Sequence, residues 1–206
     1  MTTVLGLDLA AALDPVRFGR RLGFEPEPWQ ARLLRTVAAR VLVRCARQTG
    51  KTTTVGLRAL HTAMHHPGRD VLVISPSQRQ SDELLLRVRA HYRAVAGAPK
   101  LTTDNTSTMG LVNGSRVVSL PGSEGTVRGF ANVKLLLLDE AARIEDDVLA
   151  SVLPMVGSDG QVMAFVVHAV GLPRLVVGAA RGARQRVGAA RGDGVRVGPV
   201  HTGADC

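Results

Sequence analysis

The chain has 206 residues, of which 45% are hydrophobic and only 3% aromatic, so it can form one α/β domain with an aliphatic core. Its two cysteines exclude a disulfide framework, and no apolar run is long enough to span a bilayer, so we expect a cytoplasmic protein without a membrane segment. The formal charge of +9 suits a polyanion such as DNA, although an arginine-rich surface encoded by a GC-rich genome gives the same charge.

The first part of the chain predicts helices followed by a strand–loop–helix unit. Residues 1–36 have helical composition, with Pro26 and Pro28 before a helical spacing at 29–38. The apolar run at 41–43 predicts a buried strand, and the next helix is expected from Lys51 to about His65. A second strand at 71–74 and a helix at 78–95 are predicted next.

The middle of the chain predicts a hairpin and then further parallel strands. Residues 102–108 are polar and are expected to form a loop. Strands at 109–112 and 116–120 flank Asn113-Gly114, which is typical of a hairpin turn. The following elements are a strand at 135–138, a helix at 146–155 and a strand at 162–167. This alternation predicts a mostly parallel sheet with helices on both faces, the α/β class.

The last segment differs in composition from the rest of the chain. After residue 171 it consists mainly of Gly, Ala, Arg and Val, and Val-Gly-Ala-Ala-Arg-Gly occurs at 177–182 and again at 187–192. We expect a poorly ordered low-complexity tail, with an Arg-Gly nucleic-acid-binding tail as the alternative. The predicted organisation is a helical segment at 1–36, an α/β core at 37–168 and a tail at 169–206.

A phosphate-binding loop is predicted in Arg-Gln-Thr-Gly-Lys-Thr-Thr, residues 47–53, between a strand and a helix. Gly50 lets the backbone approach phosphates, Lys51 reaches the β- and γ-phosphates, and the Thr52 hydroxyl binds Mg²⁺. Cys45 stands where the general pattern has its first glycine, and an ordinary turn before a helix is the alternative. The predicted nucleotide-binding residues are Gln30, Gln48, Thr49, Gly50, Lys51, Thr52 and Thr53.

Two adjacent acids end the strand at 135–138. Asp139 is expected to hold Mg²⁺, together with Thr52, and Glu140 is expected to orient the attacking water. Such a carboxylate has to lie at the tip of a strand next to the phosphate loop; a plain strand terminus is the alternative. Glu140, Lys51 and Arg47 are therefore the predicted catalytic residues of an ATPase that uses ATP and Mg²⁺.

Two further residues have candidate roles at this site. The Gln30 amide, after Trp29, can pair with an adenine edge, and the two other motifs favour this role over the alternative of a packed Trp beside a surface Gln. Arg47 places a guanidinium beside the phosphates, where it can stabilise transferred charge or form a salt bridge that braces the loop.

The sequences and the order of these motifs, over residues 13–164, resemble those of the ATPase domain in the large terminase subunits of tailed bacteriophages. The shared motifs are Trp29-Gln30, residues 47–52, Ser75-Pro76-Ser77-Gln78, Asn113-Gly114-Ser115, Arg128-Gly129-Phe130 and residues 138–142. The resemblance implies a RecA/ASCE-like P-loop NTPase, incomplete at its C-terminal side, that drives double-stranded DNA into a procapsid. It also implies a homo-oligomeric ring, a portal and a small terminase subunit as partners, and the host-cell cytoplasm as the compartment.

Two features of that family are not found in the sequence. The nuclease domain is missing, and the strand at 163–169 lacks the family's Ser/Thr-Thr-Pro coupling motif. We hypothesise that the reading frame slips near Phe165, because a one-base shift of the codons for 167–170 permits Ser-Thr-Pro. The underlying nucleotide sequence tests this hypothesis directly.

Two alternatives to a packaging motor remain open. One is a helicase-like DNA translocase, although such enzymes generally need a second RecA-like domain for which 206 residues leave no room. The other is a truncated or frameshifted remnant that binds nucleotide or DNA without catalysis.

Overall fold

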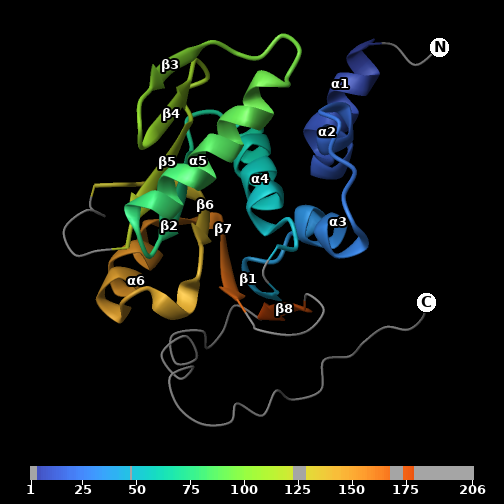
Figure 1. Cartoon of the computed structure of the whole chain (residues 1–206). Helices are drawn as coiled ribbons and strands as arrows, with labels where there is room; N and C mark the ends of the chain where they lie inside the picture. The colour runs from blue at the N-terminus through green and yellow to red at the C-terminus, as the bar shows by residue number, and fades with distance from the viewer. Residues whose placement is uncertain (1–3, 47, 123–128, 168–173, 179–206) are drawn as a thin grey trace.

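The computed structural model describes residues 4–46, 48–122, 129–167 and 174–178 as an α/β fold built on one sheet (Figure 1). The sheet has eight strands in the order β3-β4-β5-β2-β6-β7-β1-β8. The strands are β1 (Arg40–Cys45), β2 (Asp70–Ser75), β3 (Leu101–Asp104), β4 (Thr108–Leu111), β5 (Arg116–Pro121), β6 (Val133–Leu138), β7 (Val156–Val167) and β8 (Arg174–Gly178).

The central strands are parallel. β5, β2, β6, β7 and β1 run in one direction, whereas β3–β4, β4–β5 and β1–β8 are antiparallel pairs. The carboxyl ends of the parallel strands therefore meet at one edge of the sheet, which is where loops of such folds carry binding sites.

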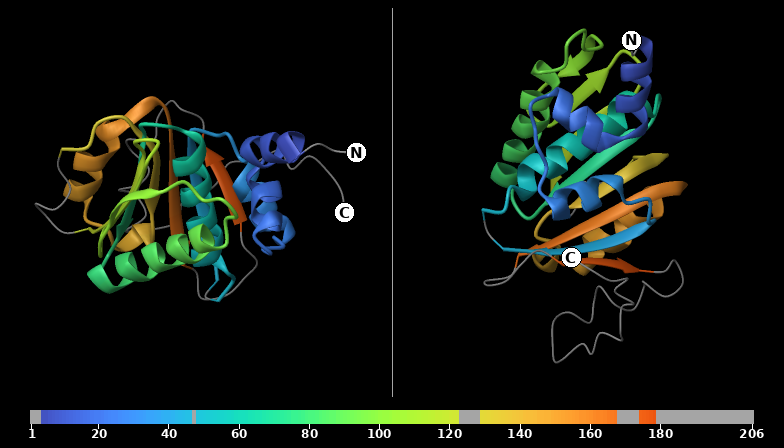
Figure 2. Two further views of the ribbon diagram at one scale, coloured as in Figure 1. Left: turned by 90° about the horizontal axis from the view of Figure 1, so that it is seen from above. Right: turned by 90° about the vertical axis from the view of Figure 1, so that its right-hand side faces the viewer.

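Helices cover both faces of the sheet, as the alternation of elements predicted (Figure 2). One apolar cluster includes Leu33, Leu57 and Leu85 and joins the first five helices to the sheet. The other includes Leu72, Leu136 and Val148 and joins the sheet to α6. The helices are α1 (Val4–Leu13), α2 (Pro15–Arg21), α3 (Pro28–Arg35), α4 (Lys51–His65), α5 (Gln78–Arg93) and α6 (Asp146–Val152), with 3-10 helices η1 (Ala141–Arg143) and η2 (Leu153–Met155).

Local sequence explains where the helices begin. Asp14 caps α2, its carboxylate accepting from the Val16 N–H at 2.9 Å, and Pro15 follows at the first helical position. Ser77 caps α5, where its hydroxyl accepts from the Gln80 N–H at 3.4 Å. The predicted helices after the phosphate loop and after β2 are confirmed, and so is the hairpin around Asn113-Gly114.

Two expectations about local structure are wrong. Residues 102–108 were expected to be a loop, but β3 occupies Leu101–Asp104 and pairs with β4 at the edge of the sheet. No regular structure was expected after residue 171, but β8 pairs antiparallel with β1 at Arg174–Gly178, where the sequence has a short Leu-Val-Val run. The rest of the expected tail lies outside the described residues, and the three-segment division of the chain stays a prediction.

None of the helices in the described part of the chain combines the length and the apolar character that crossing a membrane requires.

Candidate nucleotide site

The predicted phosphate loop lies between the carboxyl end of β1 and the first turn of α4. Gln48 and Gly50 both have left-handed backbones, with φ of 61° and 74°. Gly50 precedes α4, whose first turn contains no acidic side chain, so the free N–H groups there can receive an anion. A Cβ at Gly50 would come within 2.8 Å of the Gln30 amide nitrogen, which adds a steric reason for glycine at this turn.

Lys51 and Asp139 converge, although they are far apart in sequence. Lys51 Nζ donates to Asp139 Oδ1 at 2.5 Å, and the two side chains are 14% and 12% exposed. Asp139 follows β6, and its N–H donates to the Ile74 carbonyl oxygen of β2 at 2.8 Å, which fixes its backbone in the sheet. The strand before the phosphate loop, β1, and the strand before Asp139, β6, were expected to be neighbours. That expectation is wrong, because β7 lies between them.

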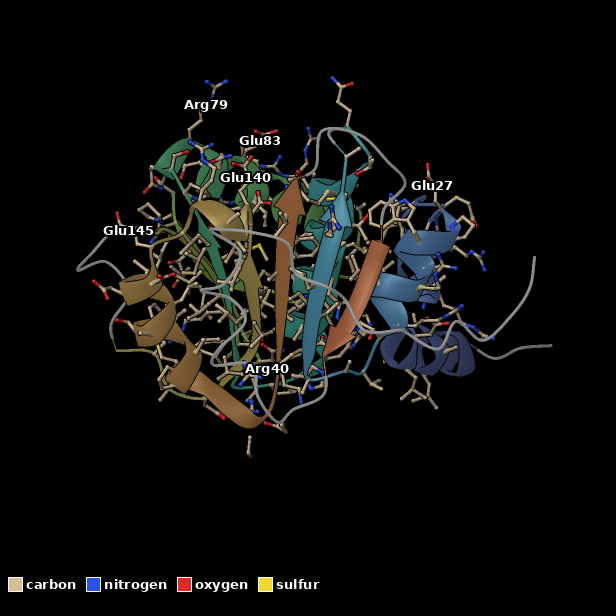
Figure 3. The ribbon with its side chains drawn as sticks, turned by 90° about the horizontal axis from the view of Figure 1, so that it is seen from below. Glu27, Arg40, Arg79, Glu83, Glu140 and Glu145 are labelled. Carbon is tan, nitrogen blue, oxygen red and sulfur yellow. The ribbon has the colours of Figure 1, made fainter. Side chains whose placement is uncertain are left out.

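Glu140 lies next to Asp139 but has a different partner. Its backbone is left-handed, with φ and ψ both 47°, and it begins η1. Its N–H donates to Asp139 Oδ1 at 3.0 Å, while its carboxylate accepts from Arg143 Nη1 at 3.0 Å. Figure 3 shows Glu140 at the same edge of the sheet as Arg79 and Glu83, and Arg40, the first residue of β1, at the opposite edge.

Gln30 is buried and is hydrogen-bonded within the chain. Its oxygen accepts from the Glu27 N–H at 2.8 Å, and its Nε2 donates to the Thr49 carbonyl oxygen at 3.3 Å. Trp29 donates from Nε1 to Glu27 Oε2 at 2.8 Å. The amide expected to read adenine thus connects α3 to the phosphate loop in this structure, and an adenine would have to replace part of these bonds.

The other predicted nucleotide-binding residues are partly exposed near the start of α4. Thr49 Oγ1 donates to the Ala46 carbonyl oxygen at 3.1 Å and so closes the loop. Thr52 and Thr53 lie in the first turn of α4, where both are partly buried, and the Thr53 carbonyl oxygen is 3.0 Å from His91 Nε2 of α5. Arg47, the third predicted catalytic residue, lies outside the described residues.

Two residues near the site were not singled out from the sequence as functional. Ser75 ends β2 with a fully buried hydroxyl, and no partner for its Oγ is found in the described chain. Arg143 is the second such residue, because its guanidinium forms an ion pair with the Glu140 carboxylate. The sequence placed Ser75 in the shared motif Ser75-Pro76-Ser77-Gln78, at the end of an apolar strand, but gave no separate role to its hydroxyl.

Cys45 replaces the first glycine of the general phosphate-loop pattern and lies at the end of β1. It is buried, and burial raises the pKa of its thiol while the nearby Lys51 opposes that shift. The side chain thus contributes an apolar wall beneath the loop rather than a reactive thiolate.

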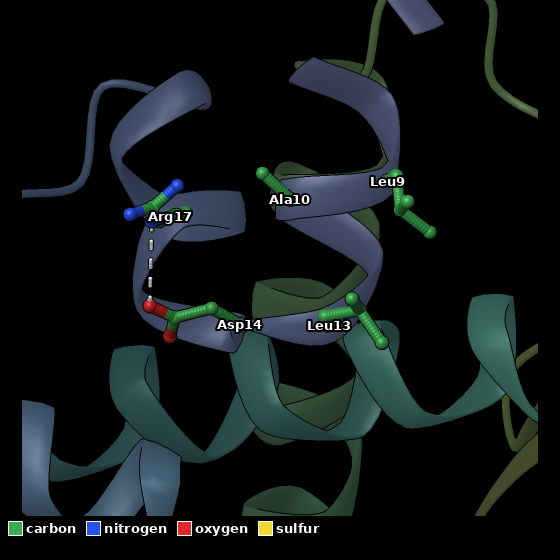
Figure 4. A pocket seen from close by; sticks show the side chains of 5 residues that line it. All are labelled: Leu9, Ala10, Leu13, Asp14 and Arg17. Carbon is green, nitrogen blue, oxygen red and sulfur yellow. Dashed lines mark ion pairs between the residues drawn. The ribbon is translucent and has the colours of Figure 1, made fainter. Parts of the chain in front are cut away.

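A separate hollow lies on α1 and α2 and shares no residue with the phosphate loop (Figure 4). Leu9 and Leu13 are exposed there, and Arg17 forms an ion pair with Asp14 at 3.8 Å. It contributes nothing to the nucleotide site.

Several solved structures share this fold with the chain. The large terminase ATPase domain of Thermus phage P74-26 has a TM-score of 0.64 at 24% identity, covering 76% of this chain and 70% of that one. The HK97 bacteriophage large terminase has a TM-score of 0.62 at 15% identity, covering 71% and 34%. A variant of Dbp5 from S. cerevisiae, bound to Gle1 and IP6, has a TM-score of 0.55 at 17% identity, covering 79% and 46%.

These likenesses confirm the P-loop ATPase fold, and at such identities they show the fold alone. No curated protein sequence matches the chain. Residues 42–165, more than half of the chain, match the family model of the RNA cytidine acetyltransferase NAT10/TcmA helicase domain. The sequence motifs resembled those of large terminase subunits, whereas the family model that matches is that of the NAT10/TcmA helicase domain. The matched segment runs from β1 to β7 and contains both the phosphate loop and Asp139, so the chain belongs to the NAT10/TcmA helicase-domain family.

Proposed function

We propose that the chain binds and hydrolyses ATP at the edge of the sheet where Lys51 meets Asp139. The observation that supports this most is the ion pair itself. It joins the first residue of α4 to the end of β6, 88 residues later, in a partly buried position beside a left-handed glycine turn. Removing two charges from water costs free energy, so a buried ion pair often stabilises a fold less than an apolar contact would. Its presence here favours a role in binding over one in stability.

The residues present fit magnesium bound to a triphosphate. Asp139 supplies a carboxylate and Thr52 a hydroxyl, and hard oxygen donors are the ligands that Mg²⁺ prefers. When bound, Mg²⁺ would neutralise charge on the phosphates and help to orient them.

Each residue then has a defined task. Lys51 would bind the β- and γ-phosphates, and Asp139 and Thr52 would hold the metal. Glu140 leaves Arg143 and accepts a proton from the attacking water, so that the nucleophile is oriented toward the γ-phosphate. Arg47 stabilises charge on the transferring group, and Gln30 contacts the adenine; both roles are proposals from the sequence.

The work proposed for this ATPase is the packaging of double-stranded DNA, as the motor domain of a terminase large subunit. The order of its motifs and the fold shared with two phage terminases support this proposal. The excess of 26 basic over 17 acidic residues suits a DNA partner. A ring of copies at a portal, with a small terminase subunit, in a host-cell cytoplasm, would follow from the same assignment.

A second candidate is a helicase-type translocase on RNA or DNA. The family match and the fold shared with Dbp5 favour it. The two candidates use the same nucleotide site and differ only in the nucleic acid that stimulates it and in the movement produced.

Steady-state ATP hydrolysis by the purified chain tests both candidates. We expect Mg²⁺-dependent turnover that Lys51→Ala abolishes, while Lys100→Ala, an exposed lysine before β3, leaves it unchanged. Stimulation by double-stranded DNA together with procapsids supports the packaging motor, and strand separation of a duplex supports the helicase-type enzyme. A folded chain without turnover would identify a non-catalytic remnant and reject both.

A further inference from the structure

The hydroxyl of Ser75 is a buried polar group for which the described residues provide no partner. Ser75 is 0% exposed, and no hydrogen-bond partner of its Oγ is found among the described residues. Its backbone is satisfied, since its carbonyl oxygen accepts from the Gly122 N–H at 2.7 Å. Leaving a buried hydroxyl unpaired destabilises a folded protein, so the group calls for a reason other than stability.

The strand register places this hydroxyl beside Asp139. β2 and β6 pair in parallel with Val73 opposite Leu137 and Ile74 opposite Leu138, so the next positions along the two strands are Ser75 and Asp139. The hydrogen bond from the Asp139 N–H to the Ile74 carbonyl oxygen continues the ladder to this point.

Side chains alternate along a strand, so Ser75 lies on the same face as Val73, and Asp139 on the same face as Leu137. Val73 and Leu137 both belong to the apolar cluster that includes Leu57 and Leu60 of α4. That face is the one from which Lys51 reaches Asp139. The unpaired hydroxyl is therefore on the nucleotide side of the sheet.

In the described structure Asp139 does not need Ser75. Its Oδ1 already accepts from Lys51 Nζ at 2.5 Å and from the Glu140 N–H at 3.0 Å. When Lys51 moves to a phosphate, the carboxylate loses its cationic partner. A serine hydroxyl has one donor and two acceptor sites, which lets it replace that hydrogen bond.

We propose that Ser75 is a positioning residue for the metal–nucleotide complex: its hydroxyl donates to the Asp139 carboxylate when Lys51 has turned to the phosphates, and so orients that carboxylate toward Mg²⁺. The inference rests on the proposed ATPase function. Hydrogen bonds from outer residues to metal ligands orient the ligands and strengthen metal binding.

Ser75→Ala separates this role from a structural one. Binding of ADP is measured by titration calorimetry with MgCl₂ and with EDTA, beside thermal unfolding of the nucleotide-free chain. We expect the variant to lose about tenfold in affinity for ADP with Mg²⁺, and nothing without it. Its unfolding temperature should stay equal or rise, because an unpaired hydroxyl has been removed.

Ser81→Ala is the matched control. Ser81 of α5 is also 0% exposed with an unpartnered Oγ, but it does not follow a strand next to β6. We expect it to leave the magnesium effect unchanged.

An unchanged magnesium effect in Ser75→Ala would overturn the inference. So would a lower unfolding temperature with equal losses of affinity in MgCl₂ and EDTA, which would mark a structural hydroxyl. Failure of the wild-type chain to bind ADP with Mg²⁺ would instead reject the proposed function, and Lys51→Ala in the same titration shows which of the two has failed.

Discussion

The two adjacent acids at the end of β6 have separate cationic partners. Asp139 pairs with Lys51, whereas Glu140 pairs with Arg143 of η1. The left-handed backbone of Glu140 turns the chain between them. Because a carboxylate that already accepts from a guanidinium is less free to accept from water, Arg143 is expected to restrain Glu140 until the catalytic arrangement forms.

Arg143→Gln should therefore accelerate ATP hydrolysis. The Arg143 side chain is 70% exposed and that of Glu140 23%, so the pair is of the weak surface type. Its loss should raise kcat by about two- to fivefold, with KM unchanged, as measured by steady-state kinetics. Arg17→Gln, which removes an equally exposed arginine paired to an acid three residues earlier, is the control. A fall in kcat would show that the pair is the productive arrangement instead.

The sequence alone was enough to predict that Lys51 and Asp139 come together. Their motifs carry the information locally: a glycine turn before a helix in one case, and acids after an apolar strand in the other. Ser75 could not be found in this way, because its unpaired hydroxyl depends on the register of β2 against β6. The hydrogen-bond partners of the Gln30 amide, Glu27 and Thr49, could not be predicted from the sequence either, because tertiary packing determines them.

At the scale of elements, the close crossing of α4 and α5 positions the phosphate loop. Gly56 of α4 faces α5 so closely that a Cβ there would lie 3.2 Å from Arg87 Cβ and 3.3 Å from the Val88 nitrogen. His91 of α5 adds a hydrogen bond to the Thr53 carbonyl oxygen at 3.0 Å, in the first turn of α4. The position of α4, the helix that carries Lys51, is thus fixed against α5 by this close approach and by the His91 hydrogen bond.

Gly56→Val should destabilise the chain, because a larger side chain meets the Arg87 Cβ and the backbone of Arg87 and Val88, none of which can rotate away. Overpacking of this kind costs about 1–3 kcal/mol in free energy of unfolding. Ala90→Val, at an exposed position of α5, should cost only a few tenths. Urea denaturation of the two variants measures the difference; equal losses would contradict the close crossing.

The elements that the sequence predicted best are those with apolar periodicity. β2 is buried along its whole length and β6 at every position except Lys134, whereas α5 buries one side and α4 is buried over most of its length. β3 was missed because Thr102, Thr103 and Asp104 are all exposed, so no alternation marks the strand. Threonine favours strands, but only the pairing with β4 decides the matter.

At the scale of the whole molecule, the order of the strands was beyond the sequence. Apolar runs predict parallel strands without saying which strands are neighbours, and the insertion of β7 between β6 and β1 follows from long-range pairing. The N-terminal helices likewise had no predicted contact. They pack beside α4, where Phe18 of α2 meets His61 edge-on at 5.4 Å between ring centroids.

His61 joins these helices to the core as a neutral imidazole. It is 5% exposed, and its Nε2 lies 3.1 Å from the Ala11 carbonyl oxygen of α1. Because a carbonyl oxygen only accepts, Nε2 carries the proton. Burial, together with the neighbouring His65 and Arg58, lowers the pKa of His61 from 6.5 to about 3.

Acid should therefore loosen the whole molecule through His61. The unfolded chain binds the proton near pH 6.5 and the folded chain only near 3, so the stability that His61 permits is complete above about pH 6.5 and declines as the pH falls toward 3. The expected slope is about 1.4 kcal/mol per pH unit in free energy of unfolding. Burial also lowers the pKa values of His65, His66 and His91, which steepens the decline.

His61→Phe removes this proton-binding group while keeping a ring against Phe18. We expect the variant to be less stable than the wild type at pH 8, because the Ala11 carbonyl oxygen loses its donor, and to lose less stability between pH 6.5 and 5. Urea denaturation at three pH values measures both effects. Parallel stability curves for the two proteins would mean that His61 takes up its proton without unfolding, and would contradict the prediction.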